Sequence, residues 1–246
     1  MTALLSTTYF GPIQWYQKLY RADHVLIEQF ESFQKQTYRN RCVIATANGT
    51  QTLTVPIEHS PLTIEHEPLT IDHSPLISDH GNWRHLHWNA LVSAYGESPF
   101  FEYYQDDLRP FFTERRWTYL LDFNEAIRQT ICELLDITPA VTYTDVFTPP
   151  SADSSLSTLH SSPASADSSL FTLHSSPVSA DSSLFTLHSS LIKDFRDAIN
   201  PKHPAPDPDF MPRPYYQVYG QRHGFLPNLS ILDLLFNMGP EAIFWL

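Results

Sequence analysis

The sequence predicts an α+β fold in which a C-terminal segment packs back on the N-terminal part. Three observations support this prediction. Short β-rich runs gather in the first 57 residues, helical spacing of apolar residues follows between 83 and 135, and the tail is too apolar and too short to stand alone. A β-hairpin region, a helical middle and the C-terminal segment then form one domain.

The predicted elements of the β region follow in order. Residues 13–22 have the apolar spacing of a short helix, and residues 24–27 form a short apolar strand. Two β-rich runs, 40–45 and 52–57, flank Asn48-Gly49, the dipeptide that most strongly signals a tight hairpin.

The helical middle and the tail show recognisable helix signals. Apolar residues recur every three or four positions over 83–95 and over 117–135. Between them, Ser98-Pro99 resembles an N-cap followed by proline at the first helical position. Near the C-terminus, Ser230 and Asp233 have capping-box spacing, and Gly239-Pro240 ends that helix.

Two tandem repeats interrupt this domain. Residues 57–80 repeat with period seven, but a proline in every unit excludes a coiled coil. Residues 148–192 repeat a Ser-rich unit of 14 whose few apolar side chains cannot offset roughly 1–2 kcal/mol of backbone entropy per ordered residue. We therefore expect a disordered insert at 148–192, with 1–147 and 193–246 as parts of the same domain.

Each repeat unit carries one histidine beside acidic residues or serines. Histidine with carboxylates is a reasonable ligand set for a divalent metal. Duplication of any unit that contains one histidine, however, produces regularly spaced histidines without any selection for metal binding. We therefore predict no metal site.

Composition and charge limit the remaining function classes. The net charge of −12 arises mostly in the repeats and argues against nucleic-acid binding, which needs a basic face. No apolar run approaches the roughly 18 residues of a membrane span, and the N-terminus lacks a signal-peptide pattern. We therefore expect a cytoplasmic protein without a membrane span, whose two cysteines are reduced.

A dense polar stretch at 33–41 is the first candidate site. If this stretch is extended, Lys35, Arg39 and Arg41 point to one face, and Tyr38 and Asn40 point to the other. The cationic face suits a phosphate- or carboxylate-bearing small molecule. The alternative is a solvated strand edge that its charges protect from aggregation.

A histidine pair on the predicted helix 83–95 is the second candidate. His85 and His87 are natural acid–base groups, but on a helix they diverge by roughly 200°. The alternative is an aromatic-rich helix start whose histidines pair with the backbone. Cys42 lies in a strand pattern that favours a small buried side chain over a nucleophile. No glycine-rich phosphate loop or GxSxG, CxxC or HExxH motif occurs, which argues against a nucleotide-binding fold and a standard hydrolase.

The order of these features resembles the WbqC-like family. The segments that carry the resemblance are Tyr9 to Pro12, Lys35 to Ile44, Leu53 to Ile57, Trp83 to Tyr95, Ser98 to Phe101 and Asn228 to Leu235. The chain departs from the pattern at Thr7-Thr8, where many relatives have Gln-Pro. It departs again at Gln29-Phe30, where many have an Asp pair, although Glu28 and Glu31 flank that position.

The resemblance implies a bacterial cytoplasmic protein of surface-polysaccharide (O-antigen) biosynthesis. It implies an acyl, aminoacyl or other group transferase acting on an activated sugar or related metabolite, with unknown cofactor and protein partners. The alternative is a non-enzymatic binding or scaffold protein of envelope biogenesis. The expected catalytic residues are His85 and His87, and the expected substrate-binding residues are Tyr9, Lys35, Tyr38, Arg39, Asn40 and Arg41.

Overall fold

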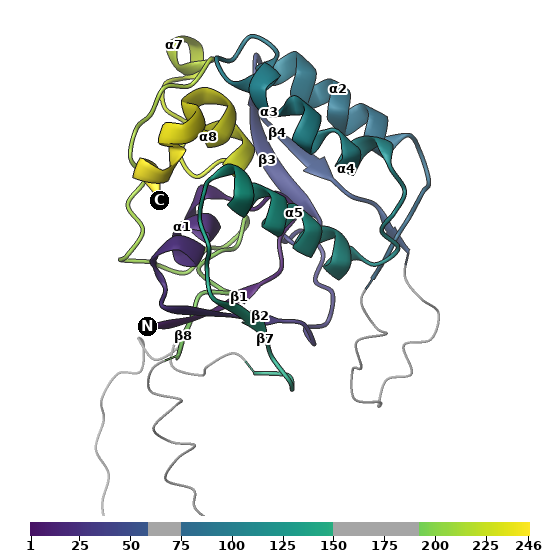
Figure 1. Ribbon diagram of the computed structural model, residues 1–246, viewed down its shortest axis with the longest axis vertical. Coiled ribbons are helices and arrows are strands. Elements are labelled where there is room, and N and C mark those ends of the chain that lie inside the picture. The colour runs from purple at the N-terminus through teal and green to yellow at the C-terminus, as the bar shows by residue number, and fades with distance from the viewer. Residues whose placement is uncertain (59–74, 150–191) are drawn as a thin grey trace, which may run out of the picture.

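A four-stranded parallel sheet joins the two ends of the chain. The computed structural model describes residues 1–58, 75–149 and 192–246 (Figure 1). The strands lie in the order β7-β2-β1-β8, and every pair in this sheet is parallel. Their bounds are Thr2–Ser6 (β1), His24–Glu28 (β2), Val141–Tyr143 (β7) and Ile192–Asp194 (β8).

The helices occupy the remaining layers of the fold. The first of them connects β1 to β2 and packs against both strands. In Figure 1 the sheet lies at the base of the molecule, with α1 and α5 above it. The helices are α1 (Ile13–Arg21), α2 (Trp83–Tyr95), α3 (Phe101–Leu108), α4 (Pro110–Thr113), α5 (Leu120–Leu134), α7 (Gly220–His223), α8 (Ile231–Met238) and the 3-10 helix η3 (Gly239–Trp245).

Two antiparallel pairs complete the described structure. Strand β3 (Arg41–Thr46) pairs with β4 (Gly49–Thr54), which confirms the predicted hairpin. Strand β5 (Ile57–Glu58) pairs with β6 (Leu76–Ile77) and so joins the two sides of the period-seven segment. Residues 59–74 and 150–191, on which the predictions for the repeats fall, lie outside the described residues.

The predicted α+β class is confirmed, and the C-terminal segment packs back on the N-terminal part. It does so through β8, which pairs with β1, and through α8, which contacts α1. The parallel sheet itself was not predicted. Strands β7 and β8 have three residues each, and their partners lie far away in the sequence, so no local pattern marks them.

Several local details differ from the predictions. Ser98 does not cap α3, because its hydroxyl donates a 2.6 Å hydrogen bond to the carbonyl of Tyr95. Ser230 does cap α8 and accepts from Leu232, but Asp233 does not complete a capping box because its carboxylate bonds elsewhere. The helix predicted over 117–135 begins three residues later, at Leu120.

Aromatic side chains form much of the core between the hairpin and the helices. Tyr9 stacks on Phe123 with ring centroids 5.8 Å apart, and Phe10 stacks on Phe112 at the same separation. No helix among the described residues is long and apolar enough to cross a membrane.

Candidate functional site

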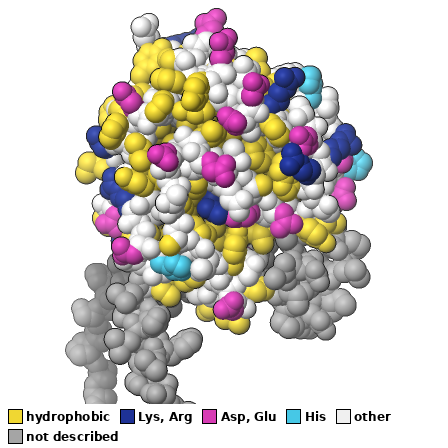
Figure 2. Space-filling model, in the orientation of Figure 1, with side chains coloured by type: hydrophobic (Ala, Val, Ile, Leu, Met, Phe, Trp, Pro, Cys, Tyr) yellow, Lys and Arg dark blue, Asp and Glu magenta, His cyan; other side chains and the backbone are white. Residues whose placement is uncertain are grey.

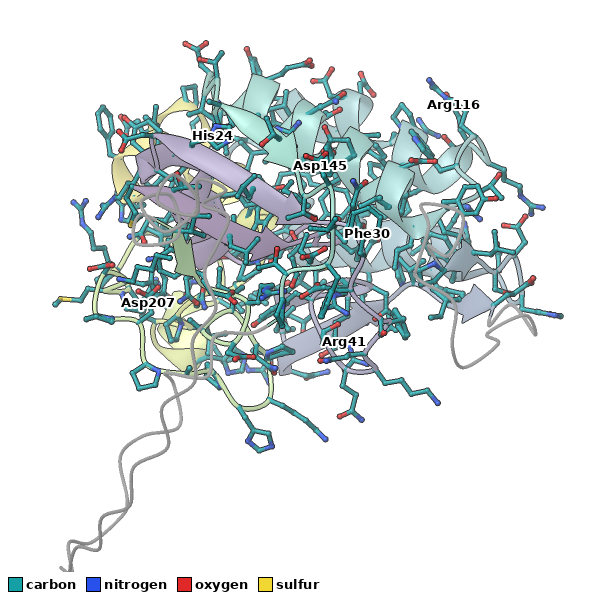
Figure 3. The ribbon with its side chains drawn as sticks, turned by 90° about the horizontal axis from the view of Figure 1, so that it is seen from below. His24, Phe30, Arg41, Arg116, Asp145 and Asp207 are labelled. Atoms are coloured by element: carbon teal, nitrogen blue, oxygen red, sulfur yellow. The ribbon has the colours of Figure 1, made fainter. Side chains whose placement is uncertain are left out.

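A cleft opens at the carboxyl ends of β1 and β8. The chain passes from β1 to β2 on one side of the sheet, whereas β8 lies on the other side of β1. In an open parallel sheet, such a reversal of strand order leaves a crevice in which ligands commonly bind. Viewed from below, the strands run from the side of His24 toward Phe30 and Asp145, so their carboxyl ends face the middle of the molecule (Figure 3).

Three segments distant in the sequence line this cleft. They are residues 5–8 after β1, residues 195–200 after β8, and positions between 31 and 39 of the loop that follows β2. Trp15 and Phe195 are aromatic residues of the lining and are almost fully buried. The enclosed space is about 60 Å³, which is room for a small group rather than a whole metabolite.

Two buried arginines line the cleft, and each is paired within the protein. The Arg39 guanidinium donates to the carbonyl of Ser32 at 2.7 Å and to the carboxylate of Glu31. Burial lowers the pKa of Arg39, and Glu31 partly offsets this effect. The group nevertheless stays protonated at neutral pH because an arginine pKa starts so high.

Arg196 joins the ends of three strands. Its Nε and Nη2 donate to Asp194 at 2.9 and 2.6 Å, and its Nη1 donates to Glu31 at 3.3 Å and to the carbonyl of Thr148 at 2.9 Å. The same Nη1 lies 3.9 Å from the carboxylate of Glu28. These bonds use four of the five N–H groups of the guanidinium, so a second bidentate partner would find only one donor.

Glu28 is a buried carboxylate with a full set of donors. It accepts hydrogen bonds from the hydroxyl of Thr144 at 2.9 Å and from the backbone N–H groups of Phe30 and Thr148 at 2.8 and 2.7 Å. These bonds tie the end of β2 to the chain that follows β7. Glu28 therefore holds the end of β2 in place next to the cleft, without lining the cleft itself.

The structure divides the predicted polar stretch. Tyr38 and Arg39 line the cleft, and Lys35 is exposed on the same loop. The stretch 31–40 contains no strand, so Lys35 and Arg39 do not share a strand face. The amide of Asn40 donates to the carbonyl of Val55 at 2.9 Å, and Arg41, labelled in Figure 3, is the first residue of β3.

Tyr9 and His87 form a pair in the core and do not line the cleft. The Tyr9 hydroxyl lies 2.9 Å from His87 Nδ1, and both side chains are buried. Burial lowers the pKa of His87 to about 4, so the imidazole is neutral at physiological pH. His85 is exposed on α2, where its Nε2 lies 2.9 Å from the amide of Asn89, so the two histidines diverge as helix geometry predicts.

The core nevertheless holds the cleft wall in place. The backbone N–H of Tyr9 donates to the carbonyl of Tyr38 at 2.9 Å, and the amide of Asn124 donates to the carbonyl of Arg39 at 2.8 Å. The Tyr9–His87 contact in turn connects this wall to α2. These predicted residues thus lie directly behind the cleft.

Sequence reasoning missed Thr7, Thr8, Arg196, Asp197 and Asn200, which all line the cleft. A signal for the first two was present, because Thr7-Thr8 is one of the places where the chain departs from the family pattern. The run after residue 192 gave no such signal, since its role depends on β8 pairing with β1.

The other chemistry-bearing groups have simpler roles. Burial raises the pKa of the Cys42 thiol far above its usual range, as for a small core side chain rather than a nucleophile. Within 1–58, 75–149 and 192–246, no three His, Cys, Asp or Glu side chains converge as metal ligands. On the face shown in Figure 2, Lys and Arg side chains are scattered among Asp and Glu.

The fold and the cleft define an α+β protein built on a parallel sheet, with a polar cleft where the strand order reverses. The model of the WbqC-like protein family matches residues 7–212 and 206–244, and the chain belongs to that family. It is similar to the uncharacterized protein Rv1507c of Mycobacterium tuberculosis (strain ATCC 25618 / H37Rv). The two are 27% identical over 241 residues, which cover 98% of this chain and 94% of that protein. No solved structure matches the chain significantly.

Proposed function

We propose that this protein is a cytoplasmic group transferase that binds an activated sugar or a related metabolite in the cleft between β1 and β8. The observation that carries the proposal is the position of a polar cleft at the reversal of strand order, where α/β proteins bind their ligands. Membership of the WbqC-like family supports a place in surface-polysaccharide (O-antigen) biosynthesis.

The cleft residues suit a hydroxylated ligand. Tyr38 and Thr7 are among the residues that line the cleft, and each carries a hydroxyl group that can donate and accept a hydrogen bond. Lys35 is exposed on the same loop and pairs with none of the residues in the described part of the chain, so it is available to meet a phosphate outside the cleft.

Residues behind the cleft have positioning roles in this proposal. Arg39 is fixed by Glu31 and shapes the wall, and Asn40 holds the loop to the hairpin. Tyr9 and His87 anchor the same wall from the core, whereas His85 lies outside the cleft.

Native mass spectrometry of the full chain, purified from its own host, tests the proposal. A retained ligand with the mass of a phosphate-bearing sugar would support it. Tyr38→Phe should reduce the retained fraction because it removes a cleft hydroxyl, whereas Tyr103→Phe on the exposed face of α3 should not. Equal retention by both variants would place the ligand elsewhere.

A second function, a non-enzymatic binding or scaffold protein of envelope biogenesis, is favoured by exposed apolar side chains near the C-terminus. Met211, Tyr216 and Phe244 are 78%, 58% and 67% exposed. Arg213 holds the two segments together by donating to the carbonyl of Phe244 at 2.6 Å. Co-purification of a stoichiometric protein, without a small ligand, would favour this function over the transferase.

A further inference from the structure

The hairpin formed by β3 and β4 has one covered edge, which belongs to β3. The carbonyl of Val43 accepts a hydrogen bond from the backbone N–H of Ser230, the N-cap of α8, at 2.8 Å. The backbone N–H of Ala45 donates to the hydroxyl of Tyr95 on α2 at 3.0 Å. Val43 and Ala45 therefore direct their backbone groups away from β4, toward the helices.

The outer edge of β4 is open. Thr52 and Thr50 lie opposite the two residues of β3 whose backbone groups point outward, so their own N–H and C=O groups point away from β3. None of these four groups has a hydrogen-bond partner among the residues that the structure describes. Both threonines and the intervening Gln51 are exposed, and an added Cβ at Gly49 would meet no atom within 4 Å.

The other strand edges of the described structure are protected from pairing with another chain. Strands β7 and β8, at the two sides of the parallel sheet, have three residues each, and β5 and β6 have two. On β8, Lys193 also forms an ion pair with Asp209. Short strands, charged side chains and prolines are the usual protection of an edge. Strand β4 has six residues and no proline, and the sequence 42–57 contains no charged residue.

We infer that β4 is a dimer interface, at which it pairs with the β4 strand of a second copy of this chain. Two hairpins joined in this way form one four-stranded antiparallel sheet, which is more stable than two separate two-stranded hairpins. The charge of the chain favours this occupant. Two copies of a protein with a net charge of −12 repel each other, and the uncharged segment 42–57 is a place where they can meet without opposing like charges.

The strand is complementary to itself about a twofold axis beside Gln51. Antiparallel pairing about this axis places Thr50 opposite Thr52 of the partner subunit, and Thr52 opposite Thr50 of the partner subunit. The N–H and C=O groups that are open in one copy then form hydrogen bonds with those of the other copy. Gln51 meets Gln51 of the partner subunit, and two amide side chains can donate to and accept from each other.

Sedimentation equilibrium of the full chain tests this interface. The wild type should dimerise, and Gln51→Glu and Gln51→Lys should each raise the dissociation constant about tenfold or more, because each variant places like charges directly opposite. An equal mixture of the two variants should recover the dimer, since a carboxylate then faces an ammonium group. Gln36→Glu adds the same charge at an exposed position in the loop after β2 and should dimerise like the wild type.

Hydrogen exchange of the Thr50 and Thr52 amides gives an independent readout, since both should exchange slowly in the dimer and rapidly after dilution to the monomer. A monomeric wild type would overturn the inference, whether or not β4 then captures a strand of another protein. A dimer that both Gln51 variants retain, or in which the two amides exchange rapidly, would also overturn it. So would a mixture of the variants that stays monomeric, because recovery on mixing is what a misfolded variant cannot show.

Discussion

Acidification should destabilise this protein through His87, one of the two histidines that the sequence offers as catalysts. The imidazole lies in the core beside Tyr9, and burial lowers its pKa from 6.5 to about 4. The folded protein thus binds this proton less readily than the unfolded chain does. The stabilisation is therefore fully present above pH 6.5 and is lost as the pH falls toward 4.

The size of the effect follows from the two pKa values. Linkage gives a loss of about 2 kcal/mol in the free energy of unfolding between pH 7 and pH 5 from this residue alone. His85 supplies the matched control, because it is exposed two residues away on α2. Other titrating groups contribute equally to both variants and cancel in the comparison.

Urea denaturation of the full chain at pH 7 and pH 5 measures this difference. His87→Gln should lose about 2 kcal/mol less than the wild type over the interval, while His85→Gln should behave like the wild type. An equal loss in all three proteins would refute the assignment of a depressed pKa to His87. So would an NMR titration in which the His87 ring protonates near pH 6.5.

Three further substitutions probe buried polar groups and one backbone turn. Asp233→Ala should lower the free energy of unfolding by about 3 kcal/mol or more in urea, because it removes the carboxylate to which the hydroxyls of Tyr95 and Tyr215 donate. Lys18→Met should cost about 3–5 kcal/mol by leaving Asp207 buried without its partner at 2.7 Å, and the double variant with Asp207→Leu should recover much of that loss. Gly239→Ala should lower the melting temperature clearly, since the residue has φ +56° and an added Cβ would lie 2.5 Å from the ring of Phe100.

Local sequence signals predicted the local elements well. The helix over 83–95 has the bounds that apolar spacing indicates, and the β3–β4 hairpin turns at Ala47-Asn48, directly before Gly49 begins β4. These features depend on a few neighbouring residues, so a single sequence contains the information. The N-cap expected at Ser98 failed because the hydroxyl found a closer acceptor in the preceding helix.

Long-range pairing is what the sequence did not reveal. Strand β8 has three residues, only one of them strongly apolar, and its identity as a strand depends on β1 at the other end of the chain. The same holds for the cleft, since Thr8 and Asp197 become neighbours of one site only after this pairing. The polar stretch 33–41 was noticed because its charges are contiguous, but only Tyr38 and Arg39 of its predicted contacts line the cleft.

The charge network at the cleft orders the ends of neighbouring strands, although it is costly to bury. Burying Glu28, Arg39 and Arg196 carries a desolvation cost, and well-packed apolar side chains in such places are often as stable or more so. Its ion pairs offset part of that cost, because Glu28, Glu31 and Asp194 all lie around the guanidinium of Arg196 and so connect the end of β2 to the end of β8. The network therefore fixes the strand ends on which the shape of the cleft depends.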